Sequence, residues 1–237
     1  MRRLTVVVVL LVAACSSGGE RARDRTTRTT APPTAPATAP VTAAPATPVF
    51  DAVVSGIDDA TRARMPHSWR PGCPVPLDEL RLVTLDYWGY DGVEKHGELV
   101  VHADHAGAIT DAFRGLFDSR FPIERMQLVD AYGGDDFAST ADNNTAAFNC
   151  RSVVGQPGSW SEHAYGRAID VNPLVNPYLG EPRVNDPRLA PYRDRSLETP
   201  GMIRAGDAVV GAFAAVGWAW GGTWSTPDYQ HFSATGR

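Results

Sequence analysis

The sequence predicts an α+β domain with a small, mostly antiparallel sheet and helices packed on one of its faces. Short runs rich in β-branched and aromatic residues are typical of strands. Two longer stretches place apolar residues at the spacing of a buried helix face. These elements do not follow the regular β–α–β alternation that builds a parallel sheet, and this favours the α+β class.

The first half of the folded region is expected to hold strands and one helix. Its expected strands are residues 81–88, 98–102 and 126–132, and the first two are separated by a turn over 89–97. The helix should run from Ala103 or Asp104 to about Arg120, because Phe121-Pro122 disfavours its continuation. Its buried stripe would be Ile109, Ala112, Phe113, Leu116 and Phe117.

The second half begins with a polar loop that is rich in Asp and Asn, residues 133–145. Residues 167–172 read as a short strand, with Ile169 and Val171 on one face and Asp170 on the other. The Pro-rich stretch 173–200 shows little periodicity, and a loop of that length is often a functional wall or lid.

A second helix is expected over residues 201–216, ended by Gly217. Its buried stripe would be Ile203, Val209, Val210, Phe213 and Ala214. Residues 218–222 and 231–233 are then the last two short strands of the sheet.

The N-terminus resembles a bacterial lipoprotein signal. Arg2-Arg3 precedes an apolar run that is too short to span a bilayer, which takes about 20 residues. The run ends in small residues before Cys15, so residues 1–15 are predicted to be a signal peptide ending at a lipidated cysteine. An ordinary signal peptide with a nearby Cys is the alternative. A lipid chain would anchor the exported protein to the cell membrane, facing the cell wall.

Residues 16–50 are rich in Thr, Ala and Pro and have almost no large apolar side chains. Such a segment cannot bury a core, so it is predicted to be a disordered tether, or an inert stalk, that precedes a folded domain spanning 51–237.

The net charge of −5 argues against a nucleic-acid-binding protein. We expect a monomer.

Cys73 and Cys150 both lie in the region predicted to be exported, where thiols tend to oxidise. We expect them to form a disulfide that holds the Pro-rich segment 65–76 beside Arg151. Two buried free thiols are the alternative.

A candidate metal site lies in the stretch 161–170. His163 and Asp170 are seven residues apart, with Gly166 between them to permit a tight reversal before the strand. His231 is the third candidate ligand. Two imidazoles and a carboxylate would hold zinc and leave a fourth position open, as in catalytic zinc sites.

The pattern Ser161-x-His163-x-x-Gly166-x-Ala168-x-Asp170, with Asp228-x-x-His231, resembles the zinc peptidases that cut D-alanyl bonds in peptidoglycan. These are the VanY-like D-alanyl-D-alanine carboxypeptidases and the related phage L-alanyl-D-glutamate endopeptidases, which share a fold with the hedgehog signalling domain. The similarity extends to the stretches 144–152 and 220–224. It covers the second half of the folded region well and the first half loosely.

The resemblance implies one zinc ion, held by His163, Asp170 and His231, and a peptide substrate from the cell wall. It implies Asp228 as the general base, although many relatives carry Glu there and Asp resembles the endopeptidase-like branch. Arg151 would hold a substrate carboxylate or the oxyanion. The expected contacts with substrate are completed by Ser161, Tyr165 and Trp224.

Two alternatives to a peptidase remain open from the sequence. A zinc-stabilised domain that binds wall peptides or a protein without cutting would need neither Asp228 nor Arg151. A sugar-cleaving wall hydrolase lacks a convincing pair of carboxylates. His102 and His105 are rejected as a metal site, because one ends a strand and the other opens a helix.

Overall fold

A computed structural model describes residues 48–180 and 183–237, except the side chain of Val184. The predicted signal peptide with Cys15, and all but the last three residues of the predicted tether, lie outside this part of the chain. No helix within the described ranges combines the length and hydrophobicity needed to cross a bilayer.

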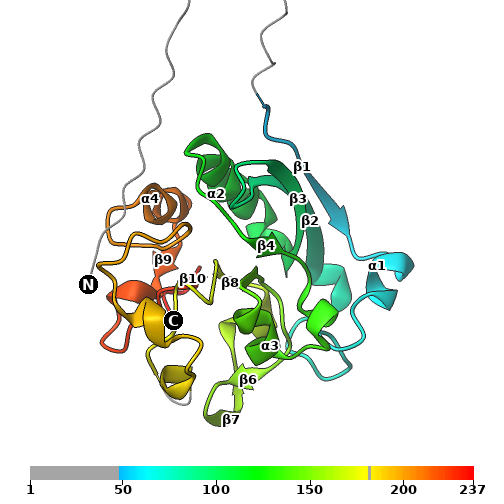
Figure 1. The fold of residues 1–237 in the computed structure, drawn as a ribbon. Coiled ribbons are helices and arrows are strands. Elements are labelled where there is room, and N and C mark those ends of the chain that lie inside the picture. The colour runs from blue at the N-terminus through cyan, green and yellow to red at the C-terminus, as the bar shows by residue number, and fades with distance from the viewer. Residues whose placement is uncertain (1–47, 181–182) are drawn as a thin grey trace, which may run out of the picture. The chain divides into compact units, whose positions relative to one another are not determined.

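The described domain is α+β, as predicted, but its strands form two three-stranded antiparallel sheets in place of one. The first sheet has the order β1-β2-β3, and the second has the order β8-β10-β9 (Figure 1). Two further pairs, the parallel pair β4-β5 and the hairpin β6-β7, are short. The strands are β1 Ala52–Gly56, β2 Leu80–Trp88, β3 Glu94–His102, β4 Arg125–Met126, β5 Asn144–Thr145, β6 Ser152–Val153, β7 Gln156–Trp160, β8 Ala168–Asp170, β9 Ala219–Trp220 and β10 His231–Ser233.

Four α-helices accompany these strands in the described residues. They are α1 Asp59–Ala63, α2 Ala106–Asp118, α3 Asp136–Ala141 and α4 Ala208–Ala215. Helix α2 packs on β2 and on α4 (Figure 1). Its buried residues include all five that the sequence predicted, so the helical spacing identified the core-facing stripe correctly.

In the first sheet β2 and the second half of β3 bury residues on both faces, whereas the edge strand β1 is largely exposed. Alternate residues of a strand point to opposite sides of the sheet. Val83 and Leu85 of β2 point into the main core with α2 and the second sheet, whereas Leu80 and Leu82 join a smaller cluster. That smaller cluster includes Cys150, whose disulfide to Cys73 is present as predicted, with a Cα–Cα distance of 5.8 Å. The segment before β2 therefore covers the face opposite α2.

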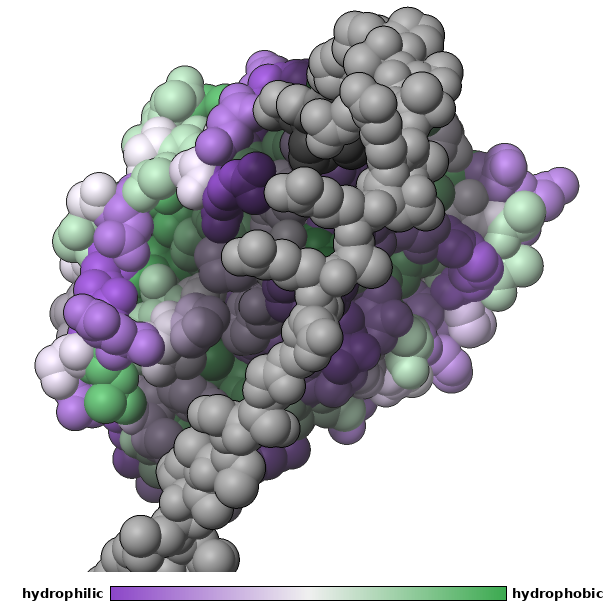
Figure 2. Space-filling view, turned by 45° about the horizontal axis from the view of Figure 1, so that its top comes forward, coloured by the Kyte–Doolittle hydropathy of each residue, from purple (hydrophilic) through white to green (hydrophobic). Residues whose placement is uncertain are grey.

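Surface polarity is mixed. On the face shown in Figure 2, hydrophilic and apolar residues alternate in patches. The exposed large apolar residues of the described chain are scattered: Val49, Val53, Val54, Val93, Phe137, Trp160 and Leu197. Single exposed apolar residues of this kind are normal for a folded domain.

The predicted strand over 126–132 is wrong, because only Arg125–Met126 pairs with a neighbour and Val129–Tyr132 is a 3-10 helix. The side chain of Asn144 bonds both the backbone N–H and the carbonyl of Gln127, and so takes the place of a partner strand. The predicted loop 133–145 contains α3, whose first turn is capped by the Asp135 carboxylate.

Two other boundaries differ from the prediction. Strand β3 begins at Glu94, so the turn is shorter than 89–97. Helix α4 begins only at Ala208, because Gly201 and Gly206 have positive φ values that interrupt a helix. Ile203 is buried ahead of the helix, and Ala214 is exposed on its outer side.

The stretch 173–200 is irregular where described, as predicted, with only the 3-10 helices Arg183–Asn185 and Ala190–Arg193. Arg195 anchors it by donating to the carbonyls of Val175 and Ile203. The guanidinium of Arg195 also lies 4.3 Å from the Tyr229 ring centroid. This segment is therefore tied to the chain that leads into β10.

Gly166 lets the chain turn from the 3-10 helix Glu162–Tyr165 into β8. Its φ of 66° is unfavourable for other residues, and its carbonyl accepts a hydrogen bond from His102 N at 2.8 Å. A Cβ at this position would lie 2.6 Å from His102 N. Glycine is therefore required at position 166 for two reasons, the positive φ and the close approach of the β3 backbone.

We expect Gly166→Ala to lower the free energy of unfolding by about 2–5 kcal/mol, combining backbone strain with overpacking against β3. Gly133→Ala is the matched control, because Gly133 also ends a 3-10 helix at φ 66° but has open space around it. Gly133→Ala should lower the free energy of unfolding by only about 1–2 kcal/mol. Urea unfolding measures both, and equal losses would contradict the role of the close approach.

Candidate metal centre

Three side chains from three elements meet at one point. His163 lies on the 3-10 helix Glu162–Tyr165, Asp170 ends β8, and His231 begins β10. The antiparallel register places His231 directly opposite Asp170. One potential ligand atom from each residue lies within 4.8 Å of the others, and all three residues are buried. Among the described residues this is the one such group that could hold a metal ion.

Each imidazole is held in orientation by a backbone oxygen on its far side. His163 Nδ1 lies 2.6 Å from the carbonyl oxygen of Ala147, which can only accept, so His163 Nε2 is left facing Asp170 at 3.3 Å. His231 Nε2 lies 3.1 Å from the backbone oxygen of Arg237, and its Nδ1 lies 3.1 Å from Asp170 Oδ1. Metal-binding histidines usually have such outer partners, so the donor set fits a zinc ion.

The segment before β6 supports two of these residues at once. Ala146 exchanges backbone hydrogen bonds with Asp170, and the next residue provides the carbonyl that orients His163. Ser161 caps the 3-10 helix through its Oγ, which accepts from His163 N at 3.3 Å. The predicted substrate contact at Ser161 therefore coincides with a structural role.

The charge of Asp170 is favoured although the residue is buried. Burial alone would raise the pKa of this carboxyl, but the charges of His163 and His231, and the hydrogen bonds from their rings, hold it well below its usual range. A carboxylate that stays ionised beside two imidazoles is ready to bind a cation.

Asp228 lies in the wall of the same cavity, three residues before His231. Its Oδ1 is shielded from solvent and has no hydrogen-bond partner among the described residues. Burial, and then the nearby charge of Asp170, raise the pKa of Asp228 to about 7. A carboxyl in this state can accept or release a proton near neutral pH.

The cavity has a volume of about 430 Å³. Its wall includes the metal-site residues together with Arg151, Trp160, Ser161, Tyr178, Arg183, Trp224, Asp228 and Gln230. The Trp224 ring lies 5.3 Å from the His231 ring. The structure thus brings every predicted site residue of the domain to the cavity except Tyr165.

Tyr165 points elsewhere, which corrects its predicted place in the cleft. Its ring packs against the smaller core cluster and lies 4.2 Å from the guanidinium of Arg167. A 3-10 helix has three residues per turn, so a side chain two positions after His163 faces away from it.

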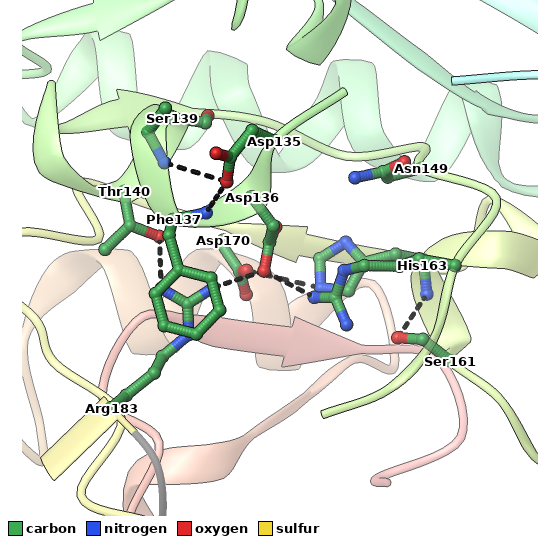
Figure 3. Close-up of polar contacts among 12 residues, drawn as sticks. Asp135, Asp136, Phe137, Ser139, Thr140, Asn149, Ser161, His163, Asp170 and Arg183 are labelled. Atoms are coloured by element: carbon green, nitrogen blue, oxygen red, sulfur yellow. Dashed lines mark hydrogen bonds and ion pairs between the residues drawn. The ribbon is translucent and has the colours of Figure 1, made fainter. Parts of the chain in front are cut away.

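Arg151 belongs to a charged network that the sequence did not predict. Arg151 Nη2 lies 3.1 Å from Asp136 Oδ2, and Arg183 Nη2 donates to the same oxygen. Figure 3 shows Arg183 reaching Asp136, with the Arg183 guanidinium bonded to Thr140 and packed on the Phe137 ring of α3. Two guanidinium groups therefore share one carboxylate oxygen at the cavity wall.

Sequence reasoning missed Asp136, Tyr178, Arg183 and Gln230. The two charged residues come from stretches without periodicity, the Asp-rich loop and the Pro-rich segment, so no pattern singled them out. One signal was available for α3, since Asp135 is followed by residues that can form a capped helix turn.

The remaining histidines of the first sheet do not join the site. The rings of His102 and His105 lie 6.0 Å apart, and His102 contacts Glu79 and Asp104.

A family model described as D-alanyl-D-alanine carboxypeptidase matches residues 154–234. The matched segment is about a third of the chain and contains His163, Asp170, Asp228 and His231. The match supports a relationship to this peptidase family and, with it, a hydrolase that acts on peptidoglycan. No curated protein and no solved structure matches the chain significantly. The VanY-like subtype and the hedgehog-like fold stay predictions.

We expect the purified protein to bind one zinc ion and His163→Ala to weaken that binding at least about 100-fold, because it removes a ligand. His102→Ala is the matched control, since His102 lies outside the cavity. Competition with a chromophoric chelator measures both affinities. Unchanged affinity in His163→Ala would remove this residue from the metal centre.

Proposed function

We propose that this protein is a zinc-dependent peptidase that hydrolyses a peptide bond in the peptidoglycan stem, next to a D-amino acid. The observation that carries the proposal is the meeting of His163, Asp170 and His231 in a cavity that also contains Asp228. The family match over this same segment supports it.

Each residue has a chemical task in this proposal. A zinc ion at the three ligands would act as a Lewis acid on the attacked carbonyl and would acidify a water molecule. Asp228 would take a proton from the attacking water and return it to the departing amine. Its unpartnered Oδ1 and its raised pKa suit a group that exchanges protons.

Arg151 would bind an anionic part of the substrate. Arg151 lines the cavity wall, and its one carboxylate partner among the described residues, Asp136, is shared with Arg183. Asp136 neutralises one of the two guanidinium groups that share it, and this leaves an excess of positive charge from Arg151 and Arg183. A free α-carboxylate at the peptide end fits this excess, which favours removal of a terminal residue.

The bond that is cut can be identified by digesting wall-derived peptides that end in D-alanine. One peptide carries a free C-terminal carboxylate, and the other carries a C-terminal carboxamide. We expect the free acid to be cleaved at least about tenfold more efficiently, because a charge-assisted hydrogen bond is lost in the amide. The mass lost identifies the bond. An internal cut that ignores amidation would indicate an endopeptidase. Bound zinc without any product would indicate a binding domain.

We expect Asp228→Asn to retain zinc but to lower the rate of hydrolysis about 10²–10⁴-fold, because it cannot accept a proton. Asp142→Asn is the control, since Asp142 lies outside the cavity and contacts Tyr132 and Arg125. Zinc content and peptide turnover are measured on the same samples. Wild-type turnover in Asp228→Asn would reject Asp228 as the base.

The proposed location is the outer face of the cell membrane, through a lipid on Cys15. Its basis is the sequence alone, namely the small residues before Cys15 after a short apolar run. Membrane fractionation of wild type and Cys15→Ala is the measurement, and equal partitioning would argue against the anchor.

A further inference from the structure

Gln230 touches the metal centre from the cavity wall without being a residue that binds zinc. It directly precedes β10, and its backbone oxygen accepts from Val171 N at 2.9 Å. Only 3% of its surface is exposed. The backbone bond across to the chain after β8 fixes where the side chain can reach.

The two ends of its amide have different surroundings. Gln230 Nε2 donates to Asp170 Oδ2 at 3.1 Å. Because an ionised carboxylate can only accept, the nitrogen must be the end that faces Asp170. Gln230 Oε1 then points away from that contact, is shielded from solvent, and has no partner among the described residues.

This arrangement costs stability. A buried acceptor without a donor is unfavourable, whereas an unbranched apolar side chain such as methionine would fill the same space without that cost. Residues that lower fold stability are often retained because a functional site needs them. Within the described residues, the one hydrogen bond of this side-chain amide goes to a proposed metal ligand.

Asp170 needs such a donor. Its carboxylate is buried, and the only side chains that bond it in the described part of the chain are His163, His231 and Gln230. With a metal ion bound, the two imidazoles would direct their nitrogens to the ion. The hydrogen bond from Gln230 would then be the one that Asp170 keeps. Loss of such outer partners weakens metal binding in other proteins.

We infer that Gln230 is a positioning residue of the metal centre, which holds the Asp170 carboxylate toward the two imidazoles and lowers fold stability in doing so. The inference rests on the metal centre of the proposed function but not on hydrolysis. It assigns the amide a role that packing alone would not give it.

The test is Gln230→Met in the otherwise unchanged chain, with zinc affinity and metal-free thermal stability measured on the same protein. We expect zinc affinity to fall about 10–100-fold. The metal-free melting temperature should be equal to that of wild type or higher. Gln156→Met is the matched control, because Gln156 lines the same cavity from the exposed strand β7. It should change neither quantity.

Wild-type zinc affinity in Gln230→Met would overturn the inference and leave the proposed function intact. A fall in both affinity and metal-free stability would also overturn it, since it would show a packing role. If Gln230→Met does not fold, Gln230→Asn, which withdraws the amide by one methylene, is judged by the same affinity criterion. Absence of zinc binding in wild type would reject the inference together with the proposed function.

Discussion

The pairing of β8 with β10 is the constraint on which the metal centre depends. The two strands are short, and 60 residues separate Asp170 from His231. Only this antiparallel register sets these two residues opposite each other, and a slip of one strand by one residue would turn its ligand to the other face of the sheet. The register is maintained by Ile169 and Phe232, which pair across the strands and are fully buried in the main core. Core packing and ligand geometry are thus fixed by the same few residues.

The electrostatics of the cavity are divided between two regions. On one side Asp170 and Asp228 are carboxylates without a Lys or Arg partner in the described chain. On the other side Arg151 and Arg183 share Asp136. A cation and an anion could therefore be held side by side, each where the protein carries the opposite charge. A peptide with a free carboxylate and a polarised carbonyl needs this combination, which a simple structural ion pair would not provide.

The local part of the site could be predicted from sequence, because His163, Gly166 and Asp170 lie within one turn and one strand. His231 could be named as a third ligand, but its place beside the other two depends on the strand register, which sets it opposite Asp170. Tyr165 could not be placed without knowing that its turn is a 3-10 helix. The strand predicted at 126–132 had suitable composition, but one amide side chain, that of Asn144, replaced the partner strand. Arg183 and Asp136 depend on contacts between irregular segments, and hydrophobic periodicity carries no information about these.

The stretch that matches the family model contains one of the two arginines of the charged network and not the other. Residues 154–234 contain Arg183 together with the proposed ligands and Asp228, whereas Asp136 and Arg151 precede them in the chain. The proposed anion-binding network would then draw on both parts of the chain, whereas the proposed metal ligands all lie in the matched part. A substitution before residue 154 could therefore alter which peptide end is accepted without removing a proposed metal ligand.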